Sequence, residues 1–120
     1  MFYGESTHSL DAKFRVTVPK RFQDELGRDA AGTPVCMLLR GQDRCLYLFS
    51  EIGFQRALEG LNIAAFNGEN QRAAQRVFFA NTARLELDAQ GRVLIPEKLR
   101  VQLGTDKEVV IVGVGDHAEI

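Results

Sequence analysis

The chain has 120 residues, of which 45% are hydrophobic, and a formal net charge of −1. This length supports one compact domain or two small halves that share a core, because a unit of about 40 residues seldom folds alone. The charge excludes a protein that binds nucleic acid through overall positive charge, so any such binding would depend on local basic patches.

The N-terminal part of the chain predicts a unit of strand, turn, strand and short helix. Its segment LDAKFRVTVPKRFQDELG, residues 10–27, places Val16 and Val18 on the inward side of the strand after the turn. Pro19 then suits the first turn of a helix, which Gly27 would end. The apolar strands expected after this helix are residues 35–39 and 45–49.

The middle of the chain, residues 51–81, predicts two connecting helices. Ser50 is a good N-cap for the first, whose apolar residues keep helical spacing. Residues 62–69 predict a loop. The second helix, residues 70–80, carries an apolar stripe, so we expect it to cross over and cover the sheet. The stripe consists of Ala73, Ala74, Val77 and Phe78.

The C-terminal part of the chain repeats the N-terminal unit. Its segment LDAQGRVLIPEKLRVQLG, residues 87–104, matches the first segment at a constant offset of 77 positions. Asp88 and Gly91 suit a short hairpin turn with a bulge. Pro96 would open the following helix and Gly104 would end it. The strands expected after this helix are residues 109–112 and 118–120.

Two copies of one unit indicate a pseudo-two-fold axis and an α+β fold that is mainly β. We expect a first repeat at residues 1–50, connecting helices at 51–81 and a second repeat at 82–120. Both repeats should share one core, because neither is large enough to fold well by itself.

Two arginines hold identical positions in the two copies. Arg15 and Arg92 directly follow the turns and alternate with inward valines, so we expect both to point into solvent. If the turns lie side by side across the axis, the arginines form a basic ridge with Lys13 that suits phosphate or the edge of guanine. The alternative is that each arginine forms a minor ion pair with the aspartate of its own turn, Asp11 or Asp88. The spacing leaves both alternatives open.

The remaining reactive residues do not predict a catalytic or metal site. Cys36 and Cys45 lie in apolar runs, which favours buried free thiols, and with only His8 and His117 they make no zinc ligand set. We expect His8 to be a partly covered structural residue. Turn formation is enough to explain the paired aspartates, so we expect no enzyme activity and no cofactor. With no signal peptide and no apolar run of bilayer length, we expect a cytoplasmic protein.

The chain resembles the MraZ family, which has two repeats of the AbrB type. The resemblance is carried by the two DxxxR turns, the helices that follow a proline, the segment RGQDRCLYLF and the ending VGVGDHAEI. It implies a swapped-hairpin β-barrel made by interleaving the two halves. It also implies a ring-shaped homo-oligomer and a nucleoid-associated transcriptional regulator. Such a regulator binds short direct repeats of double-stranded DNA upstream of the division and cell-wall gene cluster, with no membrane partner and no small-molecule substrate.

The family motif falls on both turns, with one departure. The residues assigned by the resemblance are Asp11, Lys13 and Arg15 in the first turn, and Asp88, Gly91 and Arg92 in the second. Phe14 stands where the family pattern has glycine, and a bulky residue at positive φ costs about 1–2 kcal/mol. Either the first turn has another geometry, or Phe14 packs against a neighbour or a base.

A second function from another class is an AbrB-type scaffold or an antitoxin-like module that assembles with a protein partner. Thr17 and Leu94, exposed on the strands after the turns, could serve that surface together with Phe14.

Overall fold

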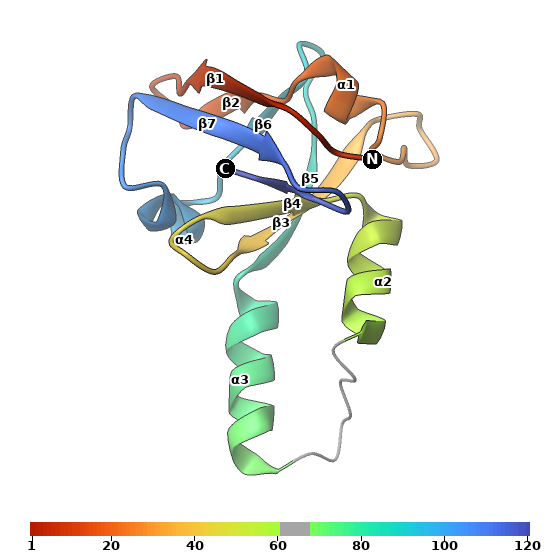
Figure 1. Ribbon diagram of the computed structural model, residues 1–120, viewed down its shortest axis with the longest axis vertical. Coiled ribbons are helices and arrows are strands. Elements are labelled where there is room, and N and C mark those ends of the chain that lie inside the picture. The colour runs from red at the N-terminus through yellow and green to blue at the C-terminus, as the bar shows by residue number, and fades with distance from the viewer. Residues whose placement is uncertain (61–67) are drawn as a thin grey trace.

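The computed structural model describes residues 1–60 and 68–120. Eight strands form a compact body, and two longer helices extend from one side of it (Figure 1). The elements are β1 Glu5–Ser9, β2 Arg15–Thr17, α1 Lys20–Gln23, β3 Val35–Arg40, β4 Leu46–Phe49, α2 Glu51–Gly60, α3 Glu69–Ala80, β5 Thr82–Glu86, β6 Arg92–Leu94, α4 Glu97–Arg100, the 3-10 helix Val101–Leu103, β7 Glu108–Gly113 and β8 Ala118–Glu119.

The strands of the two halves are interleaved. The larger sheet has the order β1-β7-β8-β4-β3-β5, and β2 pairs with β6 in a two-stranded ribbon. All of these pairings are antiparallel, and β1, β2 and β3 of the first half each pair with a strand of the second. The mainly β, α+β fold expected from the sequence is therefore confirmed.

A pseudo-two-fold axis relates the halves. Strands β1 and β5, strands β2 and β6, and helices α1 and α4 have bounds that differ by the 77 positions of the sequence repeat. In the β2–β6 ribbon Val16 lies directly opposite Val93, its own equivalent in the repeat. The axis therefore passes between these two valines, which are 1% and 0% exposed.

The local hairpins expected from the alternating pattern are only partly formed. The turns are closed by backbone hydrogen bonds, from Asp11 N–H to Arg15 C=O at 3.1 Å and from Asp88 N–H to Arg92 C=O at 2.9 Å. Beyond the turns the strands separate, since β2 pairs with β6 rather than with β1. Each turn thus becomes a tip that connects two different sheets.

One hydrophobic cluster fills the space between the two sheets and draws on both halves. The short helices contribute Phe22 and Leu99, each 1% exposed and equivalent in the repeat. Both helices begin directly after a proline, as expected. Gly104 adopts a left-handed conformation after the 3-10 helix, with φ 65°. The prediction for Gly27 is wrong, because α1 ends at Gln23 and Gly27 is not left-handed.

The expectation that the second connecting helix covers the sheet is also wrong. Helix α3 has no buried residue and extends away from the sheets, roughly alongside α2 (Figure 1). Its Val77 is 57% exposed, whereas the ring of Phe78 stacks on Phe54 of α2 with centroids 6.2 Å apart. The apolar stripe of α3 therefore lies largely in solvent. None of the helices in the described ranges is long and apolar enough to cross a membrane.

The start of the first connecting helix is confirmed. Ser50 Oγ accepts a hydrogen bond of 3.0 Å from the N–H of Gly53, which is the bond of an N-cap. The second helix starts one residue earlier than expected, at Glu69. Most of the loop predicted at residues 62–69 lies outside the described residues.

The two thiols differ in burial. Cys36 is fully buried, as expected, and burial raises the pKa of its thiol to about 12. The expectation for Cys45 is wrong, because its side chain is only partly buried at the end of the β3–β4 turn. There its thiol donates to the carbonyl of Gln42 at 2.8 Å. Burial, followed by the neighbouring Glu119 carboxylate, raises the pKa of Cys45 to about 11. Neither thiol is therefore an activated nucleophile.

Candidate nucleic-acid interface

The two tips have the same geometry, and in each an aspartate organises the turn. We call residues 11–15 the first tip and residues 88–92 the second tip. In the first, Asp11 Oδ1 accepts hydrogen bonds from the N–H groups of Lys13 at 2.9 Å and Arg15 at 2.8 Å. In the second, Asp88 Oδ1 accepts the equivalent bonds from Gln90 at 3.0 Å and Arg92 at 2.8 Å. These bonds form an Asx turn, so both aspartates are turn residues, as expected.

The second carboxylate oxygen of each aspartate holds the arginine of the same tip. Asp11 Oδ2 lies 2.6 Å from Arg15 Nε, and Asp88 Oδ2 lies 2.8 Å from Arg92 Nε. The ion pairs proposed as an alternative to the basic ridge are therefore formed. The arginine side chains remain 32% and 30% exposed, so the pairing orients them without removing them from solvent.

The β2–β6 ribbon brings the two tips together. Because Val16 and Val93 face the core, the outward face of the ribbon presents the residues on either side of them. Arg15 and Arg92 both lie on this face, near opposite ends of the three-residue ladder. Arg92 Nη1 comes within 4.0 Å of Asp11 Oδ2 of the first tip, and Lys13 is exposed at the turn. Arg15 and Arg92 thus share one face of the ribbon, and Lys13 is exposed in the turn two residues before Arg15.

Phe14 adopts the same backbone conformation as the glycine of the second tip. Its φ is 61°, compared with 76° for Gly91, so the idea of another geometry for the first turn is wrong. The Phe14 ring packs against the core cluster, and the guanidinium of Arg100 lies 4.5 Å above its centroid. The alternative in which Phe14 packs against a neighbour therefore describes the structure, and this packing compensates for the strained φ.

The residues that support the tips were not found by sequence reasoning. Gln23 and Arg100 are equivalent in the repeat, and each lies at the end of a short helix. Gln23 covers Gly91 so closely that a Cβ added there would collide with its amide. The sequence contains one indication of these contacts. Where the second tip has Gly91 and its supporting residue is Gln23, the first tip has Phe14 and its supporting residue is Arg100.

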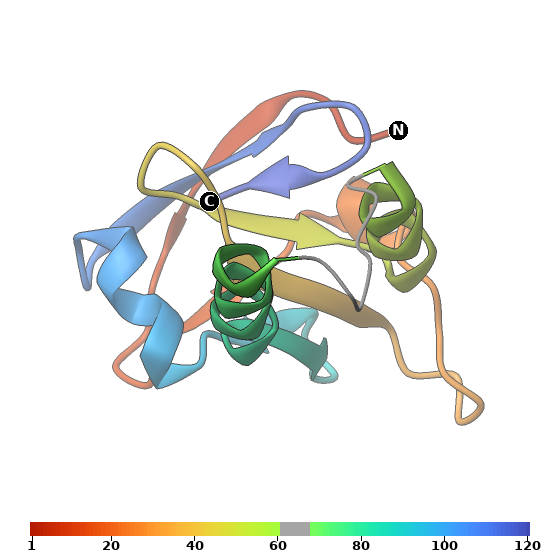
Figure 2. The same cartoon turned by 90° about the horizontal axis from the view of Figure 1, so that it is seen from below.

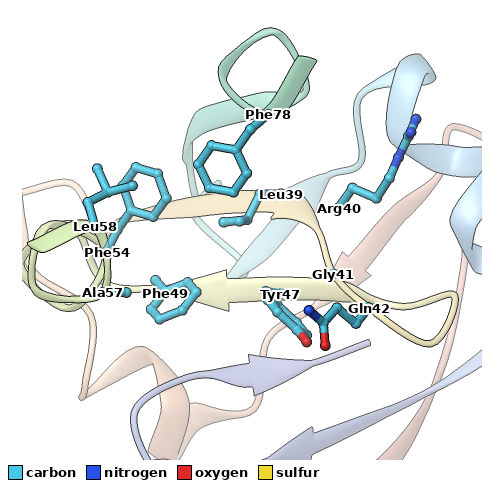
Figure 3. A pocket seen from close by; sticks show the side chains of 10 residues that line it. All are labelled: Leu39, Arg40, Gly41, Gln42, Tyr47, Phe49, Phe54, Ala57, Leu58 and Phe78. Carbon is cyan, nitrogen blue, oxygen red and sulfur yellow. The ribbon is translucent and has the colours of Figure 1, made fainter. Parts of the chain in front are cut away.

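A groove of about 440 Å³ lies away from the tips, between the larger sheet and the helices α2 and α3 (Figure 3). Its walls are largely apolar, with Phe54 from α2 and Phe78 from α3 facing strands β3 and β4. The lining residues are Leu39, Arg40, Gly41, Gln42, Tyr47, Phe49, Phe54, Ala57, Leu58 and Phe78. Seen from below, α3 stands over the middle of the body and α2 over one end (Figure 2).

The two histidines are held by neighbouring side chains. His8 is partly buried, as expected, and its Nε2 lies 2.7 Å from Ser6 Oγ. His117 stacks on Phe49, with ring centroids 4.9 Å apart, and lies between the carboxylates of Asp116 and Glu119. Within residues 1–60 and 68–120, no group of His, Cys, Asp and Glu side chains could hold a metal ion.

The tip aspartates make the stability of the fold sensitive to acid. Hydrogen bonds to the charged carboxylate, first from the N–H of Arg15 or Arg92, hold the pKa values of Asp11 and Asp88 below the ordinary value of 3.8. A lowered pKa in the folded state stabilises the fold above the unfolded value. That stabilisation is lost as the pH falls through the folded value.

We therefore expect the melting temperature to decrease at pH values below about 4, and part of this decrease should come from Asp11 and Asp88. The double variant Asp11→Asn/Asp88→Asn should melt lower at pH 7 and lose less stability between about pH 5 and pH 2. Calorimetry across this range measures both effects. Asp106→Asn, at an exposed position, is the control and should keep the wild-type acid dependence. An equal loss on acidification in the double variant and the wild type would contradict the assignment.

The family match and the similar proteins found by comparison all carry the same family name. Residues 1–77 and 78–120 match the family described as "MraZ protein, putative antitoxin-like". Three similar proteins are each named "Transcriptional regulator MraZ". The protein of Carboxydothermus hydrogenoformans is 44% identical, that of Acetivibrio thermocellus 40% and that of Syntrophomonas wolfei 38%. Each comparison covers 100% of this chain and 80% of the relative.

Proposed function

The chain belongs to the MraZ family, and from this premise we propose that it is a transcriptional regulator that binds double-stranded DNA through its two tips. The observation that carries the proposal is the arrangement of Arg15 and Arg92 on the outward face of the β2–β6 ribbon. Each guanidinium is oriented by an aspartate of its own tip. An arginine fixed in this way loses little side-chain entropy when it meets a phosphate or a guanine edge.

The ion pairs are compatible with DNA contact because they use only part of each guanidinium. Asp11 contacts Nε of Arg15, and Asp88 contacts Nε of Arg92. Among the described residues, the pair with Asp11 is the one ion pair of Arg15. The terminal nitrogens of Arg15 can therefore donate to a phosphate, while Asp11 keeps the side chain in position. A net charge of −1 keeps the long-range attraction to DNA weak, so specificity would come from these local contacts.

We further propose that copies of the chain assemble into a ring-shaped homo-oligomer in the cytoplasm, associated with the nucleoid. One copy presents few cations, so binding to short direct repeats would gain affinity from many tips acting together. The expected target lies upstream of the division and cell-wall gene cluster. Uncovered apolar surface on α3 supports self-association, since Val77 and Phe79 are 57% and 43% exposed.

A footprint on the DNA upstream of the gene for this protein tests the function. We expect protection of several short repeats at regular spacing, with affinity that falls steeply as salt rises. A control fragment with the same base composition and scrambled repeats should not be protected. Protection without any regular spacing would contradict binding to direct repeats, and no protection at low salt would contradict DNA binding.

The groove between the larger sheet and the connecting helices favours one alternative, an oligomeric scaffold or antitoxin-like module that binds a protein partner. Its wall is mostly apolar and open to solvent, and Leu94 on the ribbon is 49% exposed. Light scattering with and without DNA separates the two functions. A scaffold would assemble fully and ignore DNA, whereas a regulator would bind it.

A further inference from the structure

The two tips share a backbone conformation but differ in charge. Each supporting side chain makes the same hydrogen bond, from Gln23 Nε2 to Val18 C=O at 2.8 Å and from Arg100 Nε to Ile95 C=O at 2.9 Å. Val18 and Ile95 are themselves equivalent in the repeat. Arg100 thus makes the same backbone hydrogen bond as Gln23 and adds a positive charge.

The charge of Arg100 belongs to the first tip although the residue comes from the second half. Its guanidinium carbon lies 4.5 Å from the centroid of the Phe14 ring, and Phe14 directly precedes Arg15 in the chain. No carboxylate lies within ion-pair distance of Arg100 among residues 1–60 and 68–120. The side chain is partly exposed, so its charge is neither neutralised nor removed from solvent.

The remaining residues increase the difference between the tips. Lys13 is exposed in the first tip, where the second tip has the neutral Gln90. Asp11 also lies 4.0 Å from Arg92 Nη1, so Arg92 has a carboxylate from each tip beside it. The first tip therefore combines three cations with one aspartate, whereas the second has one cation, Arg92, which lies beside both aspartates. The cations of the first tip are Lys13, Arg15 and Arg100.

We propose that the first tip is the principal phosphate-binding site of each copy and that Arg100 completes it from the second half. This inference rests on the proposed DNA-binding function and adds a binding residue and an order of importance to it. Stacking on Phe14 fixes the direction of the guanidinium, which favours contact with a phosphate. The strained φ of Phe14 is thereby linked to function, because a glycine at this position would leave Arg100 without its ring platform.

Arg100→Gln is the central test, because Gln23 shows that glutamine can make the same backbone hydrogen bond at this position of the repeat. We expect the slope of log affinity against log salt to become shallower by about 0.9 for each copy bound. At 0.1 M salt this corresponds to roughly a tenfold loss of affinity for each copy. Arg100→Lys should restore most of the slope because it keeps the charge.

Lys98→Gln is the matched control. It makes the same charge change on the same helix, but Lys98 Nζ bonds to Ala80 C=O at 3.2 Å, at the end of α3. Its salt slope should equal that of the wild type. We also expect Arg15→Ala to lose more affinity than Arg92→Ala, measured by fluorescence anisotropy on the same DNA.

The outcomes separate this inference from the proposed function. If the wild type binds DNA but Arg100→Gln keeps its affinity and slope, the role of Arg100 is overturned while DNA binding stands. Equal losses for Arg15→Ala and Arg92→Ala would overturn the unequal tips. If the wild type itself does not bind DNA at low salt, the proposed function fails first.

Discussion

Replacing Arg15 and Arg92 together by alanine is expected to lower the DNA affinity by roughly a hundredfold at 0.1 M salt, and by more in an assembly of several copies. Each arginine that neutralises a phosphate releases counterions, so the salt slope should become shallower by about 1.8 for each copy. Anisotropy titrations across a salt series measure both quantities. The two arginines act from one ribbon face, so their removal should affect the same bound state.

Two controls separate lost contacts from lost structure. The pair Lys20→Ala/Lys98→Ala removes the same charge from exposed positions on α1 and α4, outside residues 11–15 and 88–92 of the two tips. It should retain most of the affinity. The arginine variant must also melt cooperatively, because alanine leaves Asp11 and Asp88 without their ion pairs. A folded arginine variant with wild-type affinity and slope would remove the tips from DNA recognition.

The sequence repeat predicted where the elements lie but did not by itself predict how they pair. The strand at residues 15–17 shows the same alternation whether it pairs with its neighbour in a hairpin or with its equivalent across the axis. Only the resemblance to a known family implied the interleaved arrangement. Burial was easier to predict, and Val16, Val18, Phe22 and Leu99 all lie in the core, as their spacing indicated.

Periodicity also failed to predict what an apolar face contacts. The stripe on α3 is present, but it projects beyond the sheets, because the pattern of one helix contains no information about the position of its neighbours. The same limit applies to the tips. Spacing allowed both an ion pair and a basic ridge, and the structure contains the ion pairs on a surface that still exposes the arginines. Gln23 and Arg100 could be placed at the tips only once the exchange of strands between the halves was known.

The shared core makes a strong stability prediction for the pseudo-two-fold axis. Val93→Asp should leave most of the chain unfolded at neutral pH, because Val93 is 0% exposed and faces Val16 from the other half. An unpaired buried carboxylate costs several kcal/mol, which is comparable to the total stability of about 5–15 kcal/mol of a typical domain. If the two halves instead had separate cores, such a substitution would damage only one of them.

Leu94→Asp is the matched control for this prediction, since it introduces the same charge at the next residue of β6, on the outward face. Leu94 is 49% exposed, so the new carboxylate remains hydrated and the free energy of unfolding should change by less than about 1 kcal/mol. Circular dichroism during urea unfolding compares the two variants directly. A Val93→Asp protein as stable as Leu94→Asp would contradict a core closed across the axis. Loss of the whole circular dichroism signal in a single transition would support a shared core, because interleaved strands cannot unfold independently.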